Sequence, residues 1–186
     1  MNEIANFLYE SGQIKRVKRS GWWLAGISDP ESVADHSFRV IVIGYILAKL
    51  ENADLSRVLS ICLFHDIHET RLNDIHKVGQ RYYKMAEAED LAFLEQMNNL
   101  PDYISSPIKT AISDLKNCKS LEAKVANDAD QLECLLQARE YQSQGFCVLD
   151  WITSCNNNLK TDSAKELAKS CLQIEPNDWW DKLKKL

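Results

Sequence analysis

Hydrophobic residues recur along most of the chain every three or four positions, the spacing that places side chains on one face of an α-helix. Alternation of apolar and polar residues, which is typical of β-strands, is scarce. The pattern therefore predicts an all-α protein, built as a helical bundle. Helices are expected near residues 4–8, 32–50, 55–63, 79–98, 102–116, 119–143, 147–156 and 162–173, with a short terminal one after Pro176.

Capping residues mark where several of these helices should begin. Asp54, Ser120 and Thr161 each stand directly before an apolar helical pattern, and such side chains commonly accept a hydrogen bond from the first helical turn. The segment RSGWWLAGISDPES at 19–32 contains two glycines, a proline and two adjacent tryptophans. We expect it to be a structured loop and not a linker.

The chain shows no internal repeat and no boundary between domains. Its 186 residues fit the usual size of one domain. We expect a single domain over residues 1–186, with a core at about 7–143 and the C-terminal helices of 147–186 packed on it.

Charge and composition narrow the function classes. The net charge of −5 argues against a partner such as nucleic acid, because binding a phosphate backbone needs a basic surface. The basic cluster KRVKR at 15–19 is long enough to serve only one phosphate. No apolar run is long enough to cross a membrane, and the N-terminal residues are acidic where a secretory signal would be basic. The six cysteines form no C-x-x-C pair and are interpreted as reduced thiols, so we expect a cytoplasmic location.

Residue types that bind metals interrupt the apolar faces of three expected helices. His36 lies in the first turn of the second helix, and His65 and Asp66 end the third. Asp130 lies among apolar side chains of a long later helix. Taken alone, such a histidine is more often a cap or a core residue, whereas a buried carboxylate is costly unless it is paired or holds a metal. Together the three interruptions point to one site for a divalent cation such as manganese, cobalt, iron or zinc.

The order of these residues resembles the H…HD…D signature of the HD-domain phosphohydrolases, an all-helical superfamily in which those side chains hold a divalent cation. Further motifs narrow the resemblance to the branch that contains the 5′-deoxynucleotidases. They are R-x-x-W at 19–22, P-E-S-V-x-D-H at 30–36 and HD-x-x-E-x-x-x-x-D at 65–74. The likeness covers nearly the whole chain, roughly from Phe7 to Tyr141.

The resemblance implies metal ligands, an acidic catalytic pair and substrate-binding residues. In that order they are His36, His65, Asp66 and Asp130; Glu69 and Asp74; and Arg19 and Trp22. The spacing supports Glu69 independently, because a residue three positions after Asp66 lies on the same side if the helix continues. The resemblance does not fix the identity of the cation, which could be manganese, cobalt, magnesium, iron or zinc.

The implied reaction is the hydrolysis of deoxynucleoside 5′-monophosphates to deoxynucleoside and phosphate, by attack of metal-bound hydroxide. The family suggests a homodimer that acts on this small-molecule nucleotide substrate. Two other functions stay open: the same chemistry on another phosphate ester, such as a cyclic nucleotide or a nucleoside triphosphate, or a nucleotide-binding regulator with a vestigial metal site. A vestigial site should have lost a ligand or the acidic pair, so the complete set favours an enzyme.

Several polar residues near these motifs have no assigned role. His68 and His76 could bind a second metal or touch phosphate, although exposed loop histidines are common. Asp128 lies two positions before Asp130 and hence on a different side of the helix, which favours a supporting or surface role.

The adjacent tryptophans also allow a simple packing role. Such a pair before a glycine-containing loop usually anchors that loop to the core. By the R-x-x-W match, Trp22 is expected to face the ligand and Trp23 to pack.

Overall fold

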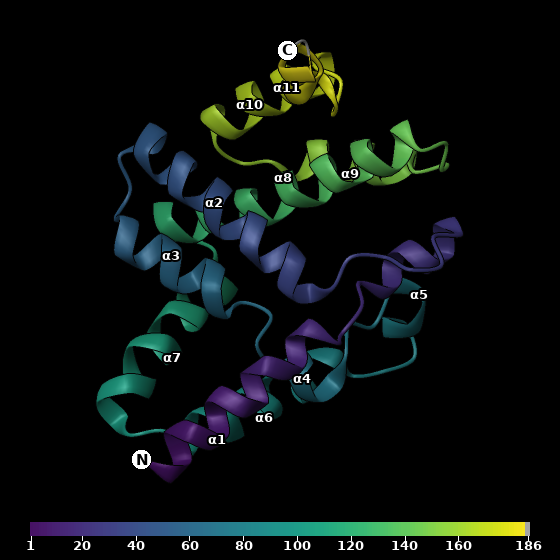
Figure 1. The fold of residues 1–186 in the computed structure, drawn as a ribbon. Coiled ribbons are helices and arrows are strands. Elements are labelled where there is room, and N and C mark those ends of the chain that lie inside the picture. Colours follow the sequence, from purple (N-terminus) through teal and green to yellow (C-terminus); the bar gives the residue numbers. More distant parts are fainter. Residues whose placement is uncertain (185–186) are drawn as a thin grey trace.

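In the computed structural model, which describes residues 1–184, the chain folds into α-helices joined by short loops and 3₁₀ turns (Figure 1). No β-strand occurs in that range, so the predicted all-α fold is confirmed. The longer helices are α1 (Asn2–Ser11), α2 (Val33–Glu51), α3 (Leu55–Phe64), α6 (Met85–Asn98), α7 (Asp102–Asn117), α8 (Leu121–Ser143), α9 (Leu149–Asn158) and α10 (Asp162–Gln173). The shorter elements are α4 (Glu69–Leu72), α5 (Lys77–Gln80), α11 (Asp178–Asp181), η1 (Gly12–Lys15), η2 (Ser20–Ala25) and η3 (Lys182–Lys184).

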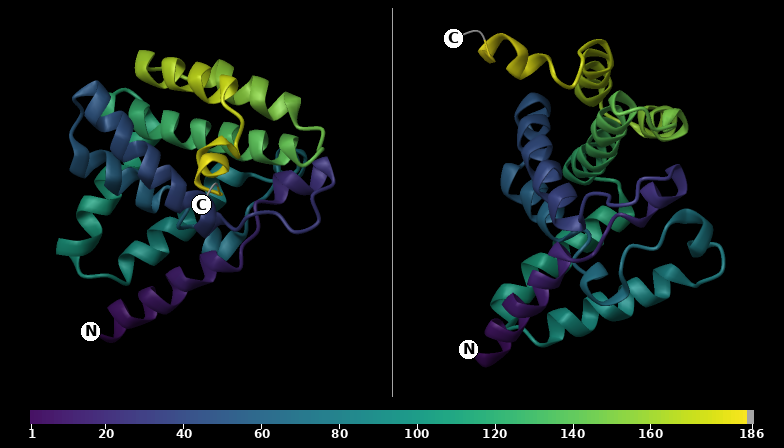
Figure 2. Two further views of the ribbon diagram at one scale, coloured as in Figure 1. Left: turned by 45° about the horizontal axis from the view of Figure 1, so that its top comes forward. Right: turned by 45° about the vertical axis from the view of Figure 1, so that its right-hand side comes forward.

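Helix α8 is the central element of the bundle. It contacts α2, α3 and α7 on one side and α9 and α10 on the other, and both views of Figure 2 show it between these groups. Its apolar residues Val125, Ala129, Leu132 and Leu135 are fully buried in the main core. Helices α2 and α3 approach closely at Gly44, where an added Cβ would lie 2.7 Å from the Sγ atom of Cys62. The division into a single domain stays a prediction.

The helix starts follow the predicted caps. The side chain of Asp54 accepts a hydrogen bond from the backbone of Arg57 at the start of α3. Ser120 and Thr161 do the same for the first turns of α8 and α10. These local signals were sufficient because a cap satisfies backbone N–H groups that the helix itself leaves free.

The predicted helix over 79–98 is wrong in its first part. The chain forms the single turn α5, then a turn over 81–84, and α6 begins only at Met85. The ring Nδ1 of His76 accepts a hydrogen bond from the backbone N–H of Gly79 at 3.1 Å, which makes His76 the cap of α5. At Gly79 an added Cβ would lie 2.8 Å from the Cγ2 atom of Ile75, so the turn depends on glycine there.

None of the helices in residues 1–184 combines the length and the apolar character that a membrane span requires.

Candidate metal centre

A capping box fixes the start of α2 and with it the position of His36. The side chain of Ser32 accepts a hydrogen bond from the backbone of Asp35, and the backbone N–H of Ser32 donates to the Asp35 carboxylate at 2.8 Å. Such reciprocal bonds hold the first helical turn in one geometry. The imidazole of His36 is completely buried and points from this turn toward α8.

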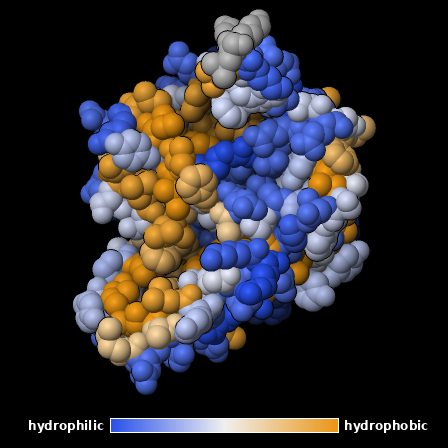
Figure 3. All heavy atoms as spheres, viewed as in Figure 1, coloured by the Kyte–Doolittle hydropathy of each residue, from blue (hydrophilic) through white to orange (hydrophobic). Residues whose placement is uncertain are grey.

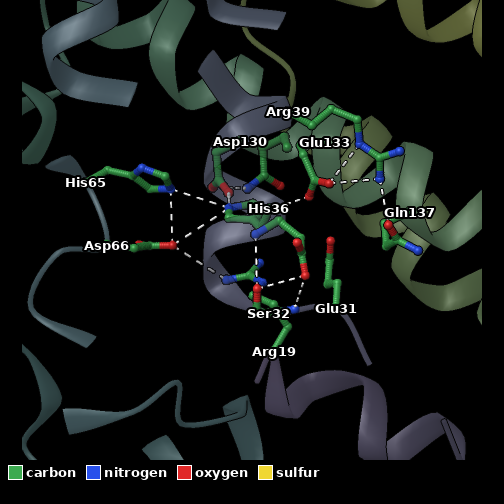
Figure 4. Close-up of polar contacts among 12 residues, drawn as sticks. Arg19, Glu31, Ser32, His36, Arg39, His65, Asp66, Asp130, Glu133 and Gln137 are labelled. Carbon is green, nitrogen blue, oxygen red and sulfur yellow. Dashed lines mark hydrogen bonds and ion pairs between the residues drawn. The ribbon is translucent and has the colours of Figure 1, made fainter. Parts of the chain in front are cut away.

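The structure brings the four residues of the H…HD…D pattern together (Figure 4). The Nε2 atom of His36 lies 3.2 Å from Oδ1 of Asp130 and 3.4 Å from Nε2 of His65. The Nε2 atom of His65 lies 3.1 Å from Oδ2 of Asp66, which is 3.7 Å from Nε2 of His36. One residue from α2, two from the turn that follows α3, and one from α8 thus converge on one point.

Hydrogen bonds on the far side of each ring favour the tautomer that a metal needs. The Nδ1 atom of His65 contacts the carbonyl of Cys62 at 2.9 Å, and Nδ1 of His36 contacts the carboxylate of Glu133. If both Nδ1 atoms carry the proton, both Nε2 lone pairs point into the cluster. There the buried Oδ2 of Asp66 has no hydrogen-bond partner in the described part of the chain. Converging lone pairs around an unsatisfied carboxylate oxygen fit a bound cation.

The carboxylates of the cluster raise the pKa values of both histidines. Burial lowers the pKa of His36, but the carboxylates of Asp130 and Glu133 outweigh it and raise that pKa to about 10. Burial likewise lowers the pKa of His65, and the neighbouring Asp66 carboxylate reverses the effect, so the net pKa is raised. Both shifts indicate that positive charge is favoured at this centre, and a bound divalent cation would supply it.

Glu133 is a site residue that sequence reasoning missed. Its carboxylate is completely buried and contacts both His36 and the guanidinium of Arg39, whose Nε donates at 3.0 Å. Arg39 is held in turn by Glu140 at 2.5 Å and Gln137 at 2.7 Å. The available signal was the spacing of three residues from Asp130, which places both carboxylates on one side of α8.

The acidic pair reaches the centre by two different routes. Helix α3 ends at Phe64, directly before His65. Glu69 therefore follows a turn over 65–68 and does not lie on a continuation of that helix. Glu69 is 9% exposed, and burial together with the charges of Asp66 and Asp74 raises the pKa of its carboxyl well above the ordinary value. Asp74 accepts a hydrogen bond from the backbone N–H of Ser20 at 2.6 Å, which ties it to the loop that carries Arg19.

A first cavity of about 540 Å³ opens beside the metal centre. Arg19, Trp22, Asp66, Asp74 and Asp130 line it together with the α9 residues Asp150, Trp151, Ser154 and Cys155. The Nη1 atom of Arg19 lies 3.7 Å from Oδ2 of Asp66, between the centre and this cavity.

Trp22 forms a fixed wall of the first cavity. Its ring stacks on Trp151 with centroids 5.8 Å apart, and its indole N–H donates to Glu31 at 3.0 Å. Only 2% of Trp22 is exposed, whereas 52% of Trp23 is exposed. The prediction that Trp23 is the packing residue is therefore wrong, because Trp22 both packs and lines the cavity.

Comparisons with known proteins agree with this geometry. The family model of the HD domain matches residues 11–171. A relative from Dictyostelium discoideum, 5′-deoxynucleotidase HDDC2, is 31% identical over 153 residues, which are 77% of this chain and 80% of that protein. The protein of that name from Homo sapiens is 30% identical over 142 residues, covering 75% and 68% of the two chains.

Solved structures show the same fold. A conserved hypothetical protein from Pyrococcus furiosus superposes with a TM-score of 0.78 at 27% identity, over 91% of this chain and 99% of the other. A protein from Magnetospirillum magnetotacticum, described as a predicted metal-dependent phosphohydrolase, superposes with a TM-score of 0.73 at 19% identity, over 92% of this chain and 90% of the other, which supports the fold alone. The chain belongs to the HD-domain family of metal-dependent phosphohydrolases.

Proposed function

We propose that this protein is a divalent-metal-dependent 5′-deoxynucleotidase, which converts deoxynucleoside 5′-monophosphates to deoxynucleoside and phosphate. The observation that carries the proposal is the convergence of two imidazoles and two carboxylates beside a cavity that also contains Arg19 and Trp22. Two relatives that bear this activity in their names are 31% and 30% identical to this chain, over 77% and 75% of its length.

We assign the metal ligands to His36, His65, Asp66 and Asp130. Imidazole and carboxylate donors suit borderline divalent ions, so manganese, cobalt, iron and zinc are the first candidates and magnesium is another. Once bound, such a cation acts as a Lewis acid on the phosphoryl group and lowers the pKa of a water molecule. The second acidic group around His36, formed with Glu31 and Glu133, is a poorer metal site because its oxygens already bind Arg39 and Trp22.

The protein's own residues then manage charge and protons. The guanidinium of Arg19 binds the phosphate oxygens, because a planar cation matches their geometry. Glu69 takes a proton from the attacking water, and burial together with the charges of Asp66 and Asp74 makes its carboxylate more basic than an exposed one. The oxygen of that water bonds to phosphorus, the bond to the 5′-oxygen breaks, and a proton passes to the leaving oxygen. Asp74 holds the Arg19 loop in place through Ser20.

Trp22 is proposed to limit the sugar. Its ring is held between Trp151 and Tyr141, and the bond from its N–H to Glu31 restrains it further. We propose that this restrained wall excludes an additional 2′-hydroxyl on steric grounds. Steric exclusion of this kind gives modest discrimination, on the order of 100-fold against one hydroxyl.

A panel of nucleotides tests the function. The purified protein is incubated with deoxynucleoside monophosphates, ribonucleoside monophosphates, cyclic nucleotides and triphosphates, each with manganese, cobalt or magnesium, and released phosphate is measured. The proposal expects the deoxynucleoside monophosphates to turn over fastest. Turnover of only a cyclic nucleotide or a triphosphate would replace the substrate class. A rise in melting temperature without any turnover would indicate a nucleotide-binding regulator.

We further propose a cytoplasmic homodimer. Exposed apolar side chains gather along α2, and this face is orange in Figure 3. They are Phe38, Val42, Tyr45, Ile46 and Leu50. A contiguous apolar helix face of this kind commonly marks a protein interface. Light scattering on the purified protein, and on Tyr45→Lys, tests the dimer; the variant is expected to be monomeric.

A further inference from the structure

A second cavity, of about 410 Å³, borders the metal centre on another side. Both cavities are lined by Arg19, Asp66, Asp74 and Asp130. Along α8 the first cavity continues from Asp130 toward the C-terminal end of the helix, at 131 and 134, whereas the second continues toward the N-terminal end, at 126 and 127. The metal centre therefore lies between the two spaces.

Besides Arg19, which lines both cavities, two lysines line the second cavity, and one, Lys77, lines the first. Lys116 comes from α7 and Lys160 from the loop between α9 and α10, and both are exposed to solvent. The Nζ atom of Lys160 donates to the Sγ atom of Cys118 at 2.8 Å, and no carboxylate of residues 1–184 pairs with it. Lys116 pairs with Asp90, but both are about half exposed, so this ion pair is weak and exchangeable.

Asp128 fixes the loop that presents Lys160. Its side chain is completely buried and accepts hydrogen bonds from the backbone N–H groups of Lys160 and Thr161, at 2.8 and 2.7 Å, and from the Thr161 hydroxyl at 2.7 Å. Asp128 is thus a supporting residue and lies away from the surface. Its hydrogen bonds give the Lys160 backbone a defined position at the cavity.

The residues assigned to the attacking water and to the nucleoside line different cavities. Glu69, the assigned base, lines the second cavity and does not line the first. The aromatic wall of Trp22 and Trp151, which suits a nucleoside, lines only the first. In phosphoryl transfer the attacking oxygen and the leaving oxygen lie roughly in line across phosphorus. With the nucleoside leaving into the first cavity, the attacking water comes from the side of the second.

We propose that the second cavity admits the attacking water and releases the inorganic phosphate, and that Lys160 and Lys116 bind this phosphate as it leaves. This inference rests on the proposed function. Apart from Asp66 and Asp130, which are assigned to the metal, the charged groups that line the second cavity are three cations and three carboxylates, so its lining does not repel a departing anion. They are the cations Arg19, Lys116 and Lys160 and the carboxylates Glu69, Asp74 and Glu89.

An imidazole side chain also lines the second cavity. His68, which exceeds the family motif, lines this space, and none of its ring atoms makes a hydrogen bond to another described residue. Its N–H is therefore available to a phosphate oxygen.

Titration calorimetry with inorganic phosphate tests the site on the full-length protein loaded with manganese. Lys160→Gln removes the charge at an exposed position, so the fold should persist. We expect phosphate to bind about ten-fold more weakly, the effect of losing one charge-assisted hydrogen bond. The matched control is Lys124→Gln, an exposed lysine on α8 that lines neither cavity. Equal phosphate affinity in the two variants would overturn the proposal.

Product inhibition separates this site from the substrate site. We expect the ratio of the phosphate inhibition constant to the KM of the deoxynucleotide to rise about ten-fold in Lys160→Gln. If KM rose by the same factor, Lys160 would contact the substrate itself and a separate phosphate site would be refuted. If no nucleotide turned over while calorimetry still showed binding that depends on Lys160, the proposed function would fail and the anion site would stand.

Discussion

Replacement of Glu133 by glutamine should weaken metal binding although Glu133 is not itself assigned as a ligand. Its carboxylate receives the Nδ1 proton of His36 and thereby leaves Nε2 free for the cation. A glutamine amide can instead donate to Nδ1, which favours the tautomer whose Nε2 carries the proton. Loss of such a supporting group typically lowers metal affinity 10- to 100-fold, or about 1.4–2.7 kcal/mol. Because Glu133 is completely buried, we expect the upper end of that range.

The same substitution should lower the free energy of unfolding by less than the usual cost of breaking a buried ion pair. Breaking a buried ion pair costs about 3–5 kcal/mol when the remaining charge is left without partners. Here Arg39 keeps its bonds to Glu140 and Gln137, so the loss of unfolding free energy should stay below that range.

Calorimetric titration of manganese into the metal-free protein measures the effect. The matched control is Glu140→Gln, which removes a second carboxylate from Arg39 but makes no contact with His36. The reasoning expects weak metal binding in Glu133→Gln and nearly normal binding in Glu140→Gln. Equal affinities in the two variants would show that the contact with His36 does not set the tautomer.

Three further substitutions test other parts of the account. Glu69→Gln should keep its metal, measured by elemental analysis, and lose about 10²- to 10⁴-fold in kcat, measured by phosphate release, because the base is gone. Gly44→Ala should lose about 1–3 kcal/mol of unfolding free energy in urea, because the new Cβ would lie 2.7 Å from Sγ of Cys62. Asp128→Ala should lose roughly 3 kcal/mol in the same assay, because backbone N–H groups at 160–161 would be left without a partner.

Each of these predictions has a result that would contradict it. Undiminished phosphate release by Glu69→Gln would remove that residue from proton transfer. For Gly44→Ala the control is Gly12→Ala, where no atom lies within 4 Å of the added Cβ, and equal stability would disprove the close helix contact. An Asp128→Ala protein as stable as the parent would mean that the loop at 160–161 has no need of this carboxylate.

Local signals in the sequence were sufficient for much of the fold. Apolar spacing located α7, α8 and α10 within about two residues, and the caps at Asp54, Ser120 and Thr161 lie where they were expected. These features depend on contacts within one helical turn, which neighbouring residues determine. The family resemblance, carried by the motifs at 19–22, 30–36 and 65–74, is confirmed by the match over residues 11–171.

Features that depend on distant contacts could not be read from the sequence. The turn at 65–68 carries Glu69 to the centre, whereas helical periodicity alone predicts a continuing helix. The break before Met85 depends on the cap by His76 and on the space at Gly79. The bond between Glu133 and His36 joins positions 97 residues apart. Periodicity does not encode such pairings, because they arise only when the helices pack.

The central claim is that one cation binds between α2, the turn after α3, and α8. Anomalous diffraction from crystals of the manganese-loaded protein locates the ion directly. The account predicts a single strong peak within coordinating distance of Nε2 of His36, Nε2 of His65 and the carboxylates of Asp66 and Asp130. A peak on the other side of His36, between Glu31 and Glu133, or a peak away from both histidines, would contradict it.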